Sequence, residues 1–524
     1  MSGERPFSVP LSVILGLVVL VSMLVSIPAF PATYTVDPAG DDSGTGDSAT
    51  PWRTVQHAAR VVVPGDVVTI NAGTYPESVH LSRSGTADAP IVFSANPGAR
   101  LVSPNPSASL SAFDVAPGAG YLSLVGIEAA AGFDETIFLR SGSHDIKISQ
   151  CNLHGNRAGI IMGGASKISV DHCSLHDNLA LGIRFATGTH DVQVADTDSF
   201  MNGNPSSTGC SSSVDGFAAE SSAADLTFTR VRAYGNSGDG FDLQADRVTL
   251  NDVTSNGNAC TGMKLYQNVT VRGCLVYAYA RGVAVTSVAG GSLADIAQCT
   301  IADNTGLALD VGKAKVPNVT YAVRLRNSIL TSAVKALQYV KAALLVEDHN
   351  IIFRPGLYDP VIAQVGGYRW NGHDINVGRW TQLTQQGQGT VAVDPMFLDA
   401  ALANFQVAPT SDAVGRGVPV DGVAPPLNLG MYQAPVGPTN HRPWADAGRD
   451  RSSRVYRKLS VNATGSFDPD GDVLSYAWDF GDGSVPVAGF NPGHTYLAAG
   501  AYPVTLTVSD GMASSQATVH VVVR

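Results

Sequence analysis

Three aspartates and one lysine recur at positions that a repeating fold could bring together. Asp215 and Asp239 each stand directly before a glycine, while Asp242 and Lys264 each stand two residues after one. Clustered carboxylates repel one another unless positive charge lies between them. Carboxylate oxygens are also the ligands that Ca²⁺ prefers, and a neutral lysine can act as a base. Such a group could therefore hold a divalent cation and move a proton.

The glycines beside these residues belong to a weak repeat, in which a turn-like Asn/Gly stretch leads to Gly and then to alternating apolar residues. The repeat glycines are Gly159, Gly182, Gly216, Gly240, Gly262, Gly282 and Gly306. Successive glycines are 23, 34, 24, 22, 20 and 24 residues apart. A period of about 22 residues with short apolar runs is typical of a parallel β-solenoid. The single long step predicts a loop near residues 202–213.

Alternation within each rung assigns faces to the side chains. The residue after each glycine is apolar and should point into the coil, so the next one should point outward. The predicted outward positions are Ile161, Arg184, Ala218, Asp242, Lys264, Ala284 and Ala308. Asp242 and Lys264 are thus predicted to be neighbours about one strand spacing, roughly 4.8 Å, apart. Asp215 and Asp239 should also be neighbours, and they face outward if the glycine turn directs them so.

Two arginines flank this group. Arg281 is expected one rung above, and Arg184 two rungs below Asp242. Each could pair with a substrate carboxylate or remain a solvated surface residue. The alternative for the whole group is an acidic surface stripe with one ordinary salt bridge. Registration of four charged residues on adjacent rungs favours a cation site instead.

Composition narrows the fold and the partners. The chain has 524 residues, of which 44% are apolar, 15% charged and 55 glycine. These values favour an all-β fold and argue against disorder or a helical bundle. The net charge of −11 argues against a nucleic-acid or acidic-membrane binder. An acidic polysaccharide remains compatible if a cation bridges the charges.

The two ends of the chain differ from the repeat. Residues 11–30 form one apolar stretch, so residues 1–32 are predicted to be an export signal or a membrane anchor. We therefore expect the protein outside the cell, released or tethered to its surface. The amphipathic WRTVQHAARVV segment predicts a helix that caps the open end of the coil.

Six cysteines lie in the repeat, and none forms a zinc-type spacing. Cys151, Cys173, Cys274 and Cys299 precede their glycines by seven to nine residues. We expect them to stack as an internal ladder of small apolar thiols, although neighbouring rungs also lie within disulfide range. A bridge that ties a loop between Cys210 and Cys260 is a further alternative.

Residues 437–443 are predicted to be a linker, and residues 444–524 a small β-sandwich. Their WDFGDG and YPVTLTVSDG strings resemble the PKD (polycystic kidney disease) domain, with Trp478 as a core residue. Asp468, Asp470 and Asp472 could bind a cation or simply form a turn.

The segment VDGFAAESSAADLTFTRVRAYGNSGDGFDLQ, followed one rung later by TGMKL, resembles the family 9 polysaccharide lyases. These are pectate lyases on a right-handed parallel β-helix, and the resemblance of the coil extends over most of residues 33–436. The family pattern reads roughly DGFAxK, then DDGFD, then GFKL. Carried over by match, it implies that Asp215, Asp239 and Asp242 bind Ca²⁺ and that Lys264 is the base.

Two residues depart from that pattern. Gly238 stands where the family has the first Asp of DDGFD, and Glu220 stands where it has a Lys. Asn236 or Glu220 could complete the ligand shell. If neither does, the chain could be a carbohydrate-binding or cell-surface protein that kept the fold and lost the reaction.

The implied reaction is β-elimination on pectate or a related polyuronate. It removes a weakly acidic C5 proton, which a cation on the C6 carboxylate assists by stabilising the enolate-like transition state. A nearby cation and Arg281 lower the pKa of Lys264 and adjacent aspartates raise it, so an alkaline optimum is expected. A glycoside hydrolase that uses Asp239 and Asp242 is the other enzymatic alternative. We expect the protein to be a monomer.

Overall fold

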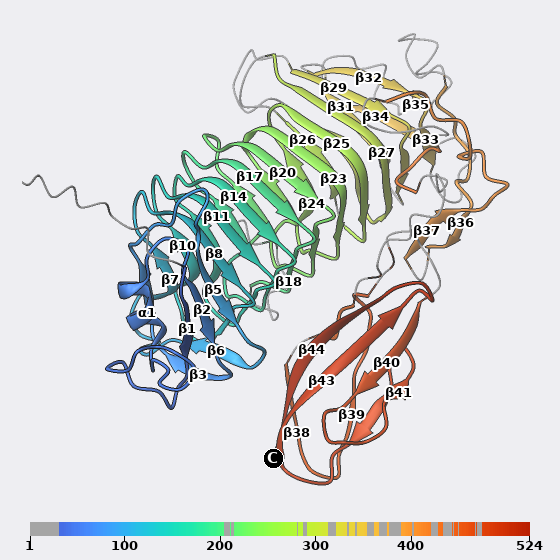
Figure 1. Cartoon of the computed structure of the whole chain (residues 1–524). Helices are drawn as coiled ribbons and strands as arrows, with labels where there is room; N and C mark the ends of the chain where they lie inside the picture. Colours follow the sequence, from blue (N-terminus) through green and yellow to red (C-terminus); the bar gives the residue numbers. More distant parts are fainter. Residues whose placement is uncertain are drawn as a thin grey trace, which may run out of the picture.

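The computed structural model is a long β-solenoid followed by a smaller β-module (Figure 1). It describes residues 31–524 except 204–209, 211–213, 280, 287–290, 313–320, 333–334, 341–342, 354–360, 366–374, 377–388, 401–402, 421–427, 433–442, 444, 449, 467 and 469–473. The apolar stretch 11–30 and all but Pro443 of the predicted linker lie outside these ranges. Among the residues described, no helix is long and apolar enough to cross a bilayer.

One face of the solenoid is a thirteen-stranded sheet that receives one strand from each turn of the coil. Its strands are β4 (Val79–Leu81), β7 (Ser111–Val115), β10 (Glu135–Leu139), β13 (Ala158–Met162), β16 (Ile183–Phe185), β19 (Phe217–Ala219), β22 (Phe241–Leu243), β24 (Thr261–Leu265), β26 (Arg281–Val285), β28 (Leu307–Val311), β31 (Lys335–Val340), β34 (Val361–Val365) and β35 (Ile375–Asn376). All pair in parallel except β34 with β35.

The rest of each turn enters a 22-stranded sheet, in most turns as a longer strand and then a shorter one. Its strands are β1 (Thr33–Val36), β2 (Val67–Ile70), β3 (Gly73–Pro76), β5 (Ile91–Ala95), β6 (Ala99–Val102), β8 (Gly120–Val125), β9 (Glu128–Ala130), β11 (His144–Ser149), β12 (Asn152–His154), β14 (Ser166–Asp171), β15 (Ser174–His176), β17 (His190–Ala195), β18 (Asp198–Phe200), β20 (Ala224–Thr229), β21 (Arg232–Tyr234), β23 (Asp246–Asn256), β25 (Val269–Tyr277), β27 (Leu293–Asn304), β29 (Tyr321–Arg326), β30 (Ile329–Ser332), β32 (Ala343–Asp348) and β33 (Ile351–Phe353). The prediction of a parallel β-solenoid is therefore confirmed.

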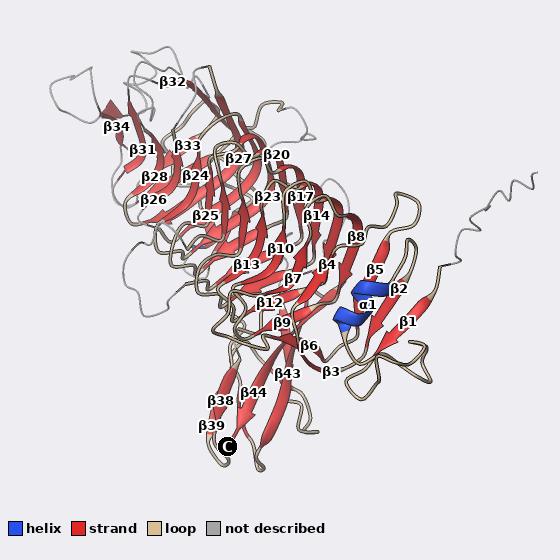
Figure 2. Cartoon of the chain, turned by 90° about the vertical axis from the view of Figure 1, so that its left-hand side faces the viewer, coloured by secondary structure: helices blue, strands red, loops and turns tan. Residues whose placement is uncertain are grey.

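Each bend between a longer and a shorter strand contains a left-handed residue, such as His172 (φ 51°) and Asp196 (φ 46°). Apolar side chains from both sheets fill the interior as one continuous core. Helix α1 (Val55–Val61) covers the first turns, as predicted, and buries Val55, Ala58 and Ala59 against them (Figure 2). At the other end, the backbone N–H of Gly430 donates to the carbonyl of Asn327, which holds the closing segment on the last turns.

A buried ladder of asparagines runs along the turns that lead into the thirteen-stranded sheet. The Nδ2 group of Asn178 donates to Oδ1 of Asn202 (3.0 Å), that of Asn202 to Asn236 (2.9 Å), and that of Asn236 to Asn258 (2.7 Å). The same Oδ1 atoms accept the backbone N–H groups of the preceding turn, as Asn236 does from Asn202. The ladder therefore satisfies turn amides that would otherwise be buried without partners.

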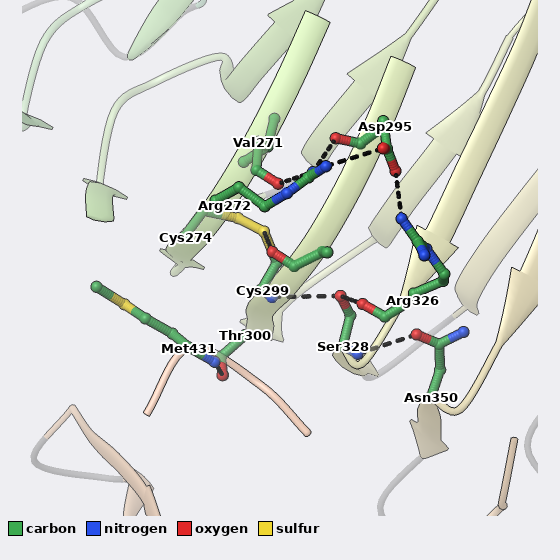
Figure 3. Close-up of a disulfide and its surroundings, with 11 residues drawn as sticks. Val271, Arg272, Cys274, Asp295, Cys299, Thr300, Arg326, Ser328, Asn350 and Met431 are labelled. Carbon is green, nitrogen blue, oxygen red and sulfur yellow. Dashed lines mark hydrogen bonds and ion pairs between the residues drawn. A yellow bond between two sulfur atoms is a disulfide. The ribbon is translucent and has the colours of Figure 1, made fainter. Parts of the chain in front are cut away.

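The cysteine ladder is only partly as predicted. Cys274 and Cys299 stand opposite each other in β25 and β27, with Cα atoms 4.4 Å apart, and form a disulfide (Figure 3). Cys151 and Cys173 are free, buried neighbours: the N–H of Cys151 donates to Sγ of Cys173, and each thiol donates to a backbone carbonyl. Cys210 and Cys260 form the alternative bridge.

The C-terminal module is a small β-sandwich around the fully buried Trp478. Its strands are β38 (Arg451–Ser453), β39 (Lys458–Ser460), β40 (Ser475–Asp479), β41 (Val487–Ala488), β42 (Gly493–Thr495), β43 (Gly500–Ser509) and β44 (Ser514–Val523). A separate antiparallel pair, β36 (Phe397–Asp399) and β37 (Asn404–Val407), precedes it. Of the proposed aspartate loop, Asp470 and Asp472 lie outside the described residues.

The ladder predicts a cost for removing one rung. We expect Asn236→Ala to lower the free energy of unfolding by about 1–3 kcal/mol, because its partners on two turns stay buried without hydrogen bonds. Chemical denaturation measures this. Asn251→Ala, on the outer face of β23, is the control and should change stability much less; equal losses would contradict the role of the ladder.

Candidate functional site

The four charged residues meet on three successive turns of the thirteen-stranded sheet. Asp215 ends the turn before β19, and Asp239 ends the turn before β22. The register of β22 and β24 places Asp242 directly opposite Lys264, as the glycine spacing predicted. Within this part of the chain, one carboxylate oxygen from each of the three aspartates lies within 4.8 Å of the others.

Both turn aspartates hold the backbone of the following turn. The N–H of Asp239 donates to Oδ1 of Asp215 (2.8 Å), and the N–H of Thr261 donates to Oδ1 of Asp239 (2.7 Å). Gly240 is required beside them, because a Cβ there would lie 2.1 Å from Oγ of Ser255. Each carboxylate therefore fixes the next turn with one oxygen and leaves the second for the cluster.

Asp215 and Asp239, whose direction the glycine spacing left open, join the outward-facing Asp242 and Lys264 but are themselves buried. Asp215 is 3% exposed and Asp239 is 0% exposed, whereas the side chains of Asp242 and Lys264 are 15% and 24% exposed. The difference arises because the first two residues belong to turns, where strand alternation does not apply. The floor of the site is therefore formed by the buried carboxylates of Asp215 and Asp239, and its partly exposed rim by Asp242 and Lys264.

Lys264 bridges the cluster. Its Nζ atom lies 2.5 Å from Oδ2 of Asp239 and 3.9 Å from Oδ2 of Asp242. Burial alone would lower the pKa of Lys264, but the hydrogen bond to Asp239 and the three carboxylate charges outweigh it and raise that pKa. In the absence of another cation, the lysine is therefore held in its charged form.

One ammonium does not neutralise three carboxylates. Burial, reinforced by the charges of Asp239 and Asp242, raises the pKa of Asp215 to about 8, although the Asp239 N–H opposes this. Three ionised carboxylates and one ammonium carry a net charge of −2, which one divalent cation would balance. The donor set consists only of carboxylate oxygens, the ligands of Ca²⁺. The residues present therefore fit such an ion.

Tyr266 is a member of the site that the sequence analysis missed. It follows β24, is buried, and lies close enough to Asp242, Asp239 and Asp215 for their charges to act on its hydroxyl. Burial and the neighbouring aspartates raise its pKa. Its distance of two residues from Lys264 was the available signal, since both side chains then lie on one side of the strand.

The two arginines do not join the cluster. Arg184 lies two turns from Asp242 in the outward column, as predicted, but its guanidinium pairs with Glu220. Arg281 lies opposite Thr261 and pairs with Asp310 (3.2 Å). Asp310 takes the outward position that the glycine spacing assigned to Ala308, because the register of β26 and β28 is shifted by two residues.

The residues suggested to complete the ligand shell are also engaged elsewhere. Glu220 accepts hydrogen bonds from Arg184 and from the backbone and hydroxyl of Thr187. Asn236 belongs to the asparagine ladder. Gly238 is buried, and its carbonyl accepts the N–H of Cys260. The candidate site therefore comprises the three aspartates, Lys264 and Tyr266.

Two family models match the chain. One is described as "Pel9A-like, right handed beta helix region" and covers residues 34–292, and the other is the PKD domain over residues 440–524. The solenoid is a Pel9A-like right-handed β-helix, and the C-terminal module is a PKD domain.

Solved structures with a similar outline include pectate lyase Pel9A, with 18% identity, 77% of this chain and 96% of that chain covered, and a TM-score of 0.43. A mannuronic-acid-specific family 6 lyase from human gut microbiota has 14% identity, coverage of 69% and 91%, and a TM-score of 0.41.

Curated relatives match over shorter stretches. A microbial collagenase of Vibrio alginolyticus is 33% identical over 85 residues, which is 16% of this chain and 10% of the relative. Collagenase ColQ1 of Bacillus cereus (strain Q1) is 37% identical over 71 residues, 14% and 7% respectively. The chain therefore spans a tenth or less of these relatives.

The buried acid predicts how stability depends on pH when a chelator removes divalent cations. The pKa of Asp215 in the folded protein, about 8, exceeds its unfolded value of about 3.9. The folded protein therefore keeps a proton that the unfolded chain loses, so stability falls as the pH rises through this window. We expect Asp215→Asn to raise Tm by at least about 2 °C at about pH 8 but not at about pH 4.5.

Thermal unfolding followed by circular dichroism measures this difference. Asp88→Asn, at an exposed position, is the control and should show no pH-dependent gain. A Tm for Asp215→Asn at or below that of the wild type at the higher pH would contradict the raised pKa of this carboxyl group.

Proposed function

We propose that this protein is a secreted, Ca²⁺-dependent polysaccharide lyase that cleaves pectate or a related polyuronate by β-elimination. The observation that carries the proposal is the position of Lys264 at the partly exposed rim of three aspartates on adjacent turns. The match of residues 34–292 to the Pel9A-like β-helix family supports it.

In this proposal, Asp215, Asp239 and Asp242 hold Ca²⁺. The bound ion would withdraw charge from the C6 carboxylate of the uronate and stabilise the enolate-like transition state. Asp215 and Asp239 are buried and joined to the backbone of the next turn, so they are held rigidly. Asp242 lies on the strand surface and is placed to face the substrate.

Lys264 is the proposed base. Its neutral amine takes the C5 proton; the C5–H electrons form the C4=C5 double bond, the C4–O bond breaks, and the departing oxygen takes a proton from solvent. The aspartates now raise the pKa of Lys264. If a bound cation balances the charge of the aspartates, the effect of burial is left, and burial lowers the pKa of Lys264 and favours the neutral amine. An alkaline optimum follows, because a lysine normally titrates near 10.4.

The arrangement is less suited to glycoside hydrolysis. A hydrolase would need Asp239 and Asp242 as acid and base beside a reacting water. Asp239 is instead enclosed and holds both Thr261 and Lys264. A non-catalytic carbohydrate-binding protein is the second candidate, which Gly238 and Glu220 favour because both depart from the family pattern.

Secretion is supported by two disulfides, Cys210–Cys260 and Cys274–Cys299, since such bonds persist in oxidising compartments. The apolar residues 11–30 would direct export, and they would tether the protein to the membrane if they are retained. We propose a monomer that acts on an extracellular acidic polysaccharide.

The test is the ultraviolet absorbance of purified protein with polygalacturonate at alkaline pH, with Ca²⁺ or with chelator. Elimination creates an unsaturated uronate that absorbs in the ultraviolet, whereas hydrolysis does not. We expect absorbance to rise only with Ca²⁺, and Lys264→Ala to slow it by at least about 100-fold, because a general base contributes about that much.

Lys147→Ala, at an exposed position on β11, is the matched control and should keep full activity. New reducing ends without absorbance would identify a hydrolase. Binding without either product, on pectate and on other polyuronates, would identify the non-catalytic protein.

A further inference from the structure

A column of stacked rings lies on the outer face of four consecutive short strands. His154, His176, Phe200 and Tyr234 stand opposite one another in β12, β15, β18 and β21. Their ring centroids are 4.9, 4.7 and 4.7 Å apart, with interplanar angles of 1°, 12° and 2°. An outer face should meet water, yet all four side chains are buried. Some other part of the protein must therefore cover them.

Residues of the PKD module contact this face beside Tyr234. The hydroxyl of Tyr234 donates to Oδ2 of Asp446 (2.8 Å). Nη1 of Arg232, the next outward residue along the strand, donates to the carbonyl of Gly465 (2.6 Å). The guanidinium also lies 5.3 Å from the ring centroid of Tyr234. Figures 1 and 2 place the module alongside the short strands.

Arg232 also joins two turns of the solenoid. Its Nε and Nη2 atoms donate to the two oxygens of Asp198 (2.9 and 2.5 Å), which lies directly opposite it. Both residues are almost fully buried. Burying an ion pair costs free energy unless its remaining groups find partners. Asp198 accepts from Nε and Nη2 of Arg232, and the carbonyl of Gly465 accepts from Nη1. The buried guanidinium is therefore better satisfied when the module is docked.

Charged groups of the module also lie within electrostatic reach of the same face farther along the coil. His520 on β44 forms an ion pair with Asp450. Asp450 lies within electrostatic reach of His154, and His520 lies within reach of Glu128 on β9. Among the described residues, the direct contacts between module and solenoid are therefore those at Arg232 and Tyr234. Asp446 acts on the charge of Arg232, and Asp450 lies within electrostatic reach of His154, so the charges of the two parts are complementary.

We propose that the outer face of the short strands is a docking surface for the chain's own PKD module, with Arg232 as the anchor that fixes it. The module is then a fixed part of one body and not a freely tethered appendage. The surface is specific, because the hydroxyl of Tyr234 and the guanidinium of Arg232 make hydrogen bonds that a different orientation of the module would leave unmade.

The anchor also has a positioning role, and this part of the inference rests on the proposed function. Asp198 belongs to the turn that leads to Asp215, and Arg232 to the turn that leads to Asp239. The ion pair therefore fastens together the two turns whose carboxylates would hold Ca²⁺, and the asparagine ladder joins the same turns at Asn202 and Asn236.

The test is small-angle X-ray scattering of the full chain, in which Arg232→Ala should increase the maximum dimension and give the profile of two mobile bodies. Tyr234→Phe with Asp446→Asn is a milder second variant, which removes the hydroxyl donor and keeps the stacked ring. Circular dichroism checks that each variant is folded. Arg247→Ala is the matched control, because Arg247 forms a similar two-point pair with Asp225 on adjacent turns but at an exposed position.

A wild-type profile that already shows two mobile bodies, or folded variants with unchanged profiles, would overturn the docking. The positioning role is tested separately by calorimetric titration with Ca²⁺, in which Arg232→Ala should weaken binding about fivefold while Arg247→Ala leaves it unchanged. Unchanged affinity in an undocked variant would overturn that role alone. Failure of the wild type to bind Ca²⁺ would instead overturn the proposed function and leave the scattering result standing.

Discussion

Exact register between successive turns is the constraint on which the rest of this molecule depends. Parallel strands about 4.8 Å apart place each side chain directly over its counterpart in the next turn. Asp242 therefore stands over Lys264, and Asp215 reaches the turn of Asp239. Like charges in such a stack repel strongly, so the cluster needs either positive charge inside it or a proton on Asp215. Lys264 supplies part of that charge.

The same register satisfies the turns. Strands bond to one another along the coil, but turn amides have no ladder of their own. The buried asparagines accept hydrogen bonds from some of these turn amides, and Asp215 and Asp239 accept them from the turn amides beside the site. A carboxylate that already holds a backbone N–H cannot rotate away. The buried carboxylates of Asp215 and Asp239 are thus held rigidly, because each accepts a backbone hydrogen bond from the next turn of the coil.

Side chains on the outer faces of the coil also stack directly over one another from turn to turn, but different residue types stack on different faces. On one face the column contains Asp242 and Lys264, and on the short strands it contains four stacked rings. Rings on an outer face need a cover, and the PKD module contacts the last of them through Asp446. The Arg232–Asp198 pair lies at this contact and joins two turns that lead to the aspartates.

The sequence by itself determined the coil, the PKD module, the capping helix and the pairing of Asp242 with Lys264. The spacing of the repeat glycines gives the number of residues in each turn of the coil, and the alternation of apolar residues shows which strand residues point inward. Short strands of fixed period leave few other registers, so the position of Asp242 and of Lys264 after their glycines was enough to pair them.

Only the tertiary structure decided the burial of Asp215 and Asp239, the presence of Tyr266, the partners of Arg184 and Arg281, and the shift that puts Asp310 in place of Ala308. Turn residues have no alternation from which their direction can be inferred, and long side chains choose among several partners. The state of the cysteines, with Cys274–Cys299 and Cys210–Cys260 bonded and Cys151 and Cys173 free, was likewise not determined by their spacing. These features arise from contacts between turns, which a period along the chain does not specify.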